Sequence, residues 1–165
     1  MRACILSTCV LALAACGGAG TSSADAQPSE ADPTAAASTG GASGEVPDLG
    51  GLPEAYRSAN LNNGRQQWFL CAACHQIADG ATHSVGPDLH GVFGDTAASN
   101  PSFPLYSPAL KESGIVWSAE TIDSWIENPR TILASTTMIF PGLRKPEDRR
   151  DLIAYLWIES GGDAE

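Results

Sequence analysis

The chain has 165 residues, with 19 acidic and 9 basic residues and a formal net charge of −10 at pH 7. This length allows one domain of ordinary size with an appendage. Basic residues nowhere cluster with interleaved aromatic residues, which argues against nucleic acid as a partner.

Residues 1–15 have the outline of an export signal, because Arg2 precedes an apolar run that is followed by small residues. The run is too short to span a bilayer stably. Its end reads LAAC and resembles the lipobox at which bacterial lipoproteins are lipidated on cysteine and cleaved. The resemblance implies a lipid on Cys16, whereas an ordinary cleaved signal would give a soluble product.

Residues 16–54 are predicted to be a flexible, disordered linker. They contain no aromatic residue and are rich in Gly, Ala, Ser and Pro. Such a segment cannot bury enough apolar surface to offset its ordering entropy. The folded part is therefore expected over residues 55–165, as a single domain.

Four segments of that domain carry helix signals: 57–74, 106–114, 117–129 and 145–162. The second and third contain a serine in a capping position, Ser107 and Ser118, and the fourth starts at Pro146. Pro129 is expected to stop the third helix. Alternating strand patterns are absent, so the fold class is predicted to be all-α. The loops 79–94 and 134–142 are long for so small a core, which suggests that a buried prosthetic group organises them.

The stretch CAACH, residues 71–75, carries the most specific chemistry. In a C-x-x-C-H arrangement the thiols of Cys71 and Cys74 add across the two vinyl groups of a haem. The following residue, His75, then becomes a fixed axial ligand of the iron.

Other uses of the two cysteines fit less well. A disulfide or a thioredoxin-like dithiol has no need for His75, and the dithiol would also need a βαβ context. A zinc site would need His83 and His90, and their spacing from the cysteines does not match that of zinc fingers.

The sixth iron ligand is predicted by elimination. Apart from the initiator, Met138 is the only methionine, and it lies in the Pro- and Gly-bounded loop TTMIFPG. A thioether ligand raises the haem potential and leaves no open position for a substrate. Loop packing by Met138, with His83 or His90 as ligand or with a vacant position, is the alternative.

From about Leu61 to Glu159 the chain resembles a class I cytochrome c of the mitochondrial and small bacterial type. The motifs CAACH, GPDLHGVFG, GIVW, WIENP, TTMIFPG and DLIAYL occur in the family's order. The resemblance implies four or five helices around one covalently bound haem c whose iron has His and Met axial ligands.

The resemblance also implies supporting roles at matching positions. The carbonyl of Pro87 would accept from the far ring nitrogen of His75, which fixes the tautomer. Tyr106 and Trp117 would reach a buried haem propionate. Thr136 would form a hydrogen bond near the Met138 loop, and Phe140 would cover the exposed haem edge.

Further positions are expected to be structural. Gly64 and Trp68 would meet Leu152 and Tyr155 where the first and last helices cross. His83 lies where the family often has a histidine that bridges two loops, although a solvated loop residue is an equal alternative.

Three departures from the family pattern stand out. Asp95 occupies a position that is often basic and near the propionate. Trp125 replaces a common tyrosine, so a hydroxyl near the methionine sulfur is expected to be missing. Thr137 precedes Met138 where relatives often have lysine, so steering toward an acidic partner should be weak.

These features predict a lipid-anchored electron carrier, not an enzyme, on the periplasm-facing side of a bacterial membrane. By resemblance, its partners are membrane-bound complexes such as a quinol–cytochrome c reductase and a terminal oxidase. The alternatives are a permanently docked cytochrome subunit of a larger complex and a haem peroxidase or gas-binding protein.

Overall fold

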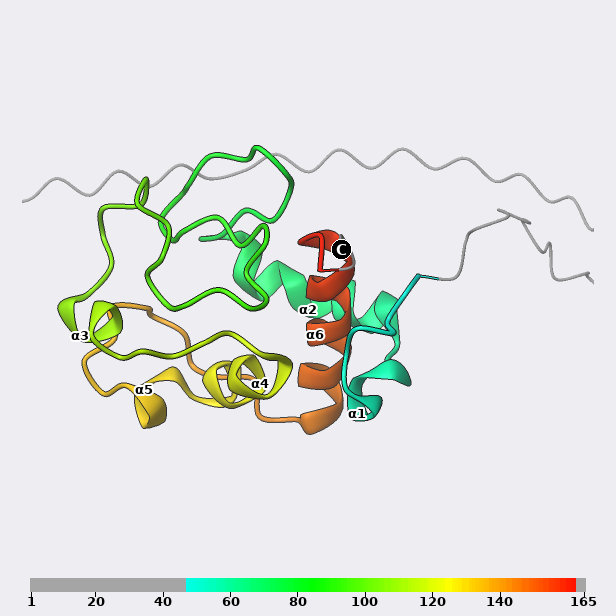
Figure 1. Ribbon diagram of the computed structural model, residues 1–165. Helices are drawn as coiled ribbons and strands as arrows, with labels where there is room; N and C mark the ends of the chain where they lie inside the picture. Colours follow the sequence, from blue (N-terminus) through cyan, green and yellow to red (C-terminus); the bar gives the residue numbers. More distant parts are fainter. Residues whose placement is uncertain (1–46, 163–165) are drawn as a thin grey trace, which may run out of the picture. The chain divides into compact units, whose positions relative to one another are not determined.

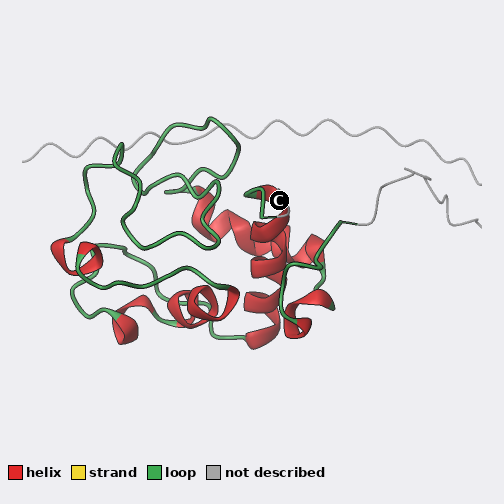
Figure 2. Cartoon of the chain, in the orientation of Figure 1, coloured by secondary structure: helices red, strands yellow, loops and turns green. Residues whose placement is uncertain are grey.

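Helices are the regular elements of residues 47–162, the part of the chain that the computed structural model describes (Figures 1 and 2). They are α1 (Glu54–Arg57), α2 (Leu61–Ala72), α3 (Pro108–Lys111), α4 (Ala119–Glu127), α5 (Pro129–Ile132) and α6 (Pro146–Glu159). The β contact found within this range is an isolated bridge between Thr96 and Val116. The prediction of an all-α fold is confirmed.

The first predicted helical segment contains a break. Asn60 has an extended backbone, with φ −92° and ψ 99°, and its side chain accepts the N–H groups of Asn62 and Asn63 at 3.1 and 3.2 Å. An asparagine in this role caps a helix. The helix that leads into the cysteine motif therefore begins at Leu61, not at Arg57, and the short α1 precedes it.

The third predicted segment contains α4, and a further short helix, α5, follows at the predicted stop. Ser118 accepts the N–H of Thr121 at 3.2 Å, and its own N–H donates to the Thr121 hydroxyl at 2.7 Å, so α4 starts with a capping box. Asn128 is extended, as is usual before proline, and it ends α4. Pro129 does more than stop that helix, because it starts the single turn of α5.

The last helix, α6, is the centre of the hydrophobic core. Leu152, Ile153 and Ala154 are completely buried, and α1, α2 and α4 all contact α6 (Figure 1). Gly161 follows the helix with a positive φ of 79°, a conformation that favours glycine after a helix end. Within residues 47–162, no helix is both long enough and apolar enough to span a membrane.

The folded part begins before Ala55, the boundary expected from composition. Leu52 is only 2% exposed, and Leu49 packs against the same core. The Arg57 guanidinium donates to the carbonyl of Leu52 at 2.8 Å and to that of Gly50 at 3.0 Å. These contacts hold the last predicted linker residues against the domain.

A polar network joins the start of α2 to α6. The Asp151 carboxylate accepts the Asn60 backbone N–H at 3.0 Å and the Asn63 amide at 2.9 Å. Burial by itself would raise the pKa of Asp151, but hydrogen bonds from Asn63, Arg150 and Asn60 hold it below its ordinary value. The carboxylate therefore stays charged and fixes the register of the two helices.

The two helices touch most closely at Gly64, where the predicted crossing with α6 is present. A Cβ at this position would press into the backbone carbonyl of Asp151 and lie 2.7 Å from the Tyr155 Cβ. Only a residue without a side chain allows this approach. Since α2 ends in the cysteine motif, the crossing also sets where that motif lies.

Gly64→Ala should therefore lower the free energy of unfolding of the haem-loaded protein by about 1 to 3 kcal/mol, because it overpacks a tight contact. Urea denaturation followed by circular dichroism would measure the change. Gln66→Ala, at an exposed position of the same helix, is the matched control and should have little effect. Equal stabilities of the two variants would contradict this account of the crossing.

Candidate functional site

The cysteine motif lies at the end of α2. Cys71 is in the last turn, and its carbonyl accepts the backbone N–H groups of both Cys74 and His75 at 2.9 Å. The two cysteines are free and half-buried. Burial, together with the nearby Cys74, raises the pKa of Cys71 to about 11. Both sulfurs are thus on one short turn, with His75 directly behind them.

The competing uses of these cysteines find no geometric support. No disulfide joins Cys71 to Cys74. Within residues 47–162, no group of three or more His, Cys, Asp or Glu residues could hold a metal ion, so the zinc set with His83 and His90 is not assembled. The high pKa of Cys71 also leaves its thiol protonated at neutral pH, which disfavours a thiolate reaction.

The His75 ring is fixed by a backbone carbonyl. Its Nδ1 lies 2.7 Å from the carbonyl oxygen of Pro87, the hydrogen bond that the resemblance implies. Because a carbonyl only accepts, Nδ1 must carry the proton and Nε2 presents a lone pair. Burial lowers the pKa of His75, although the Pro87 carbonyl and the Asp88 charge oppose that shift. The ring is therefore a neutral imidazole, the form that binds a metal.

Gly86 allows the loop to cross the His75 ring. A Cβ at Gly86 would lie 2.8 Å from both ring nitrogens, which is far inside contact distance. The backbone N–H of Gly86 also donates to the Cys74 carbonyl at 2.7 Å. Gly86 and Pro87 together hold the imidazole from one side, so the ring can turn only its Nε2 edge toward a ligand.

Met138 is held in its loop by two polar contacts. Its backbone N–H donates to the hydroxyl of the buried Thr136 at 3.2 Å, as the resemblance implies. Its sulfur accepts the indole N–H of Trp125, with 3.2 Å between nitrogen and sulfur. The sequence analysis missed this second contact. As expected, Trp125 brings no hydroxyl to the sulfur, but its indole N–H supplies a donor at the position where a tyrosine would supply a hydroxyl.

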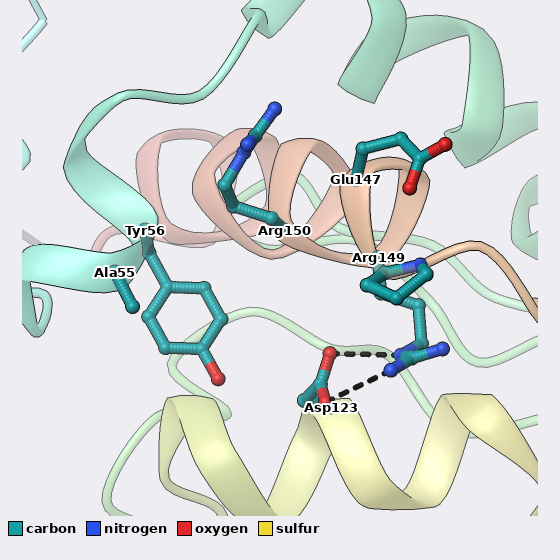
Figure 3. A pocket seen from close by; sticks show the side chains of 7 residues that line it. Ala55, Tyr56, Asp123, Glu147, Arg149 and Arg150 are labelled. Atoms are coloured by element: carbon teal, nitrogen blue, oxygen red, sulfur yellow. Dashed lines mark hydrogen bonds and ion pairs between the residues drawn. The ribbon is translucent and has the colours of Figure 1, made fainter.

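The end of the methionine loop is fastened by Arg149, which lies in the hollow shown in Figure 3. Its guanidinium donates to the carbonyls of Leu143 and Arg144 at 3.1 and 3.0 Å. It also forms an ion pair with Asp123 of α4 at 2.9 Å, drawn with dashed lines in Figure 3. None of the predicted haem residues lines this hollow, so it serves the fold rather than the cofactor.

The residues predicted to reach a propionate lie around Asp95. The Asp95 carbonyl accepts the backbone N–H of Trp117 at 2.9 Å. Burial raises the pKa of Tyr106, and the Asp95 charge raises it further. The Tyr106 ring packs edge-on against Phe103, with 4.8 Å between centroids. At the position expected to be basic, Asp95 thus contributes a negative charge that acts on Tyr106, and its carboxylate accepts the Ser99 hydroxyl at 3.1 Å.

His83 bridges two loops. Its Nδ1 accepts the Asp88 backbone N–H at 2.9 Å, and its Nε2 lies 2.6 Å from the Ser102 hydroxyl. The ring also packs edge-on against Phe103 at 5.4 Å. Of the two interpretations of His83, the bridging one matches these contacts, which join the loop after the motif to the loop before α3.

The donor set and its surroundings fit a covalently attached haem. The histidine presents a free Nε2 lone pair, and the thioether keeps a second lone pair beside the one that accepts from Trp125. Cys71, Trp117, Met138 and Phe140 are half-buried against the same core, so apolar surface surrounds these donors. Each assigned role remains a prediction, and Cys16 lies outside the described residues.

The sequence has clear relatives among characterised proteins. It is 40% identical over 107 residues to cytochrome c2 of Rhodomicrobium vannielii, covering 65% of this chain and 85% of the relative. It is 38% identical over 116 residues to cytochrome c of Arabidopsis thaliana, covering 70% and 98%. A cytochrome c2 of Afifella marina is 42% identical over 96 residues, covering 56% and 77%.

No family model matches the chain. The similarity to these relatives nevertheless extends over most of their length. The tautomer of His75 and the free lone pairs of His75 and Met138 are consistent with haem ligation, as in a cytochrome c. The chain therefore belongs to the class I cytochrome c family.

Proposed function

We propose that this class I cytochrome c is a lipid-tethered electron carrier that serves membrane-bound redox complexes from the periplasmic side. The observation that carries the proposal is the His75 ring. Its Nδ1 is fixed by Pro87 at 2.7 Å, which leaves Nε2 free to bind a metal at the position immediately after the two cysteines. This geometry has one use in the family, as the permanent axial ligand of the haem.

As a class I cytochrome c, the chain binds one covalent haem c with histidine and methionine ligands and transfers electrons without acting as an enzyme. The haem supplies one-electron chemistry at its iron. We assign the thioether bonds to Cys71 and Cys74 and the axial positions to His75 and Met138. With both axial positions filled by side chains, no site is left for a substrate.

The peroxidase alternative lacks a suitable group beside Met138. A peroxidase would need a general acid or base at this position. The residues next to the sulfur in the chain are Thr137 and Ile139, and the Trp125 N–H is already engaged with the sulfur. Neither a hydroxyl nor an alkyl group titrates near neutral pH, which supports a carrier over a catalyst.

The optical spectrum of the purified haem protein tests the proposal. The oxidised form should show the weak far-red band of sulfur-to-iron charge transfer, and the reduced form a narrow α band. Carbon monoxide should leave the spectrum of the reduced wild type unchanged, because Met138 occupies the sixth position. In the Met138→Ala variant the haem iron should be high-spin, and its reduced form should bind carbon monoxide. A high-spin wild type that binds carbon monoxide would support the peroxidase alternative instead.

Four exposed apolar residues lie close in the sequence to the proposed haem-binding residues, and we take them as the rim of the proposed haem site. Phe69, Leu70, Val85 and Ile139 all lie within two positions of Cys71, Pro87 or Met138, and each is more than half exposed, with Ile139 at 92%. The only lysines of the chain, Lys111 and Lys145, lie elsewhere in the sequence. We infer that partners such as a quinol–cytochrome c reductase or a terminal oxidase dock through apolar contact rather than through a ring of charges.

Electron transfer to membrane complexes should therefore depend little on ionic strength, because few charges on this rim are available to be screened. Stopped-flow rates between low and physiological salt would test this. A Leu70→Lys/Thr137→Lys variant should gain a clear salt dependence, whereas Asn62→Lys, at the exposed start of α2, should not. A wild-type rate that falls steeply with salt would count against the apolar docking surface.

The proposed tether starts at Cys16 and continues through the predicted linker. A flexible linker of this length gives an effective concentration on the order of 0.1 to 1 mM, which can replace electrostatic capture from solution. Lipidated cysteines of bacterial lipoproteins carry more than one acyl chain, as stable anchoring requires. A permanently docked subunit would instead remain with its partner after the anchor is lost.

Cys16→Ser should move the protein from the membrane fraction to the soluble periplasmic fraction, because the lipid can no longer be attached. Cell fractionation followed by haem staining would show this. Cys9→Ser, which leaves the LAAC motif intact, should stay with the membrane and require detergent for release. A Cys16→Ser protein that stays bound would argue for a docked subunit.

A further inference from the structure

The indole of Trp125 donates a hydrogen bond to the sulfur of Met138, at a position where the family pattern has a tyrosine hydroxyl. Trp125 is 8% exposed, and its N–H reaches the sulfur at 3.2 Å. We propose that Trp125 is a positioning residue that holds the Met138 sulfur in place for the iron. This inference rests on the proposed function, in which Met138 is the axial ligand.

Trp125 has little freedom to turn away from the sulfur. It lies in α4, is part of the buried core, and packs edge-on against Trp117 with 5.3 Å between centroids and an interplanar angle of 70°. An indole N–H can only donate. Among residues 47–162, the sulfur of Met138 is the partner it meets. The donor is thus fixed before a metal takes the other lone pair.

The same turn of α4 also holds the backbone of the methionine loop. The Ile126 carbonyl accepts the N–H of Leu143 at 2.8 Å. Gly142 has a φ of 92°, and a Cβ there would press into the Glu127 carbonyl, so the loop runs directly along the end of α4. The backbone at the end of the methionine loop is thus held by α4 through Leu143. Within residues 47–162, the hydrogen bond that holds the Met138 sulfur comes from the Trp125 N–H.

A hydrogen bond to a ligand atom acts on the metal in two ways. It draws electron density from the sulfur, which favours the reduced iron and raises the potential. It also resists movement of the sulfur away from the iron, so an added ligand competes less well. Loss of the N–H should therefore lower the potential and ease displacement of Met138.

The sharpest test replaces the Trp125 indole with benzothienylalanine, which keeps the ring shape and exchanges the N–H for sulfur. Trp125→Phe is the genetically simple companion. The control is the same pair of replacements at Trp157, whose buried indole nitrogen has no partner among residues 47–162. Midpoint potential and imidazole binding to the oxidised haem protein are measured for each.

The Trp125 replacements should lower the midpoint potential and tighten imidazole binding by about 3- to 10-fold, the range expected for one net hydrogen bond. The Trp157 replacements should leave both values unchanged. Support requires both shifts at Trp125, and a wild-type value for either one would overturn the proposal.

If the Trp125 variants fail to take up haem, NMR of the wild-type haem protein decides. Slow solvent exchange of the Trp125 indole proton and a cross-peak from it to the Met138 methyl group would support the proposal. Exchange as fast as that of a freely exposed indole N–H would overturn it. A wild type without the sulfur-to-iron band would instead refute the proposed function. A normal wild type with unaffected Trp125 variants would refute only the role of Trp125.

Discussion

The close approach of α2 to α6 at Gly64 is the constraint on which the rest of the structure depends. The absence of a side chain lets the helix backbones meet, and the Asp151 carboxylate fixes their register by accepting from Asn60 and Asn63. Because α2 ends in the cysteine motif, this one crossing places Cys71 and Cys74 relative to the core. A small apolar core can therefore position the two cysteine sulfurs without a sheet.

The two proposed iron ligands lie outside the helices, and the fold compensates with hydrogen bonds. His75 is fixed by a backbone carbonyl at 2.7 Å, and Met138 by a side-chain N–H at 3.2 Å. The first contact occupies Nδ1 of His75 and leaves the lone pair on Nε2 for a metal. The second occupies one lone pair of the Met138 sulfur and leaves the other. Loops can hold precise ligands when their polar atoms are satisfied in this directed way.

Charge and tethering provide two routes to a partner. This chain has only two lysines, and a tether is part of its proposed function. A rim of exposed apolar residues next to the ligands suits brief contact with a matching surface. Such a surface gains little from long-range attraction, so a high local concentration would matter more than steering. The proposed apolar docking surface and the proposed lipid anchor are therefore consistent with one mode of action.

Short-range chemistry was readable from the sequence. The C-x-x-C-H spacing, the caps at Ser107 and Ser118 and the start at Pro146 all depend on residues a few positions apart. The structure contains the helices that the two caps and Pro146 predict. The break at Asn60 shows the limit even of local signals. An asparagine within a helical pattern can be a cap, and only its backbone conformation shows that it is one.

Only the tertiary structure decided which distant groups meet. Helical spacing predicts that Trp125 faces the core, but it does not tell what the polar end of the indole reaches, and that end donates to Met138, 13 positions away. The same holds for Arg149, whose guanidinium closes the methionine loop, and for Leu52, which packs into the core although its surroundings resemble a linker. Periodicity and composition report burial averaged over a face or a segment, whereas a hydrogen bond depends on the position and direction of two atoms, which packing alone determines.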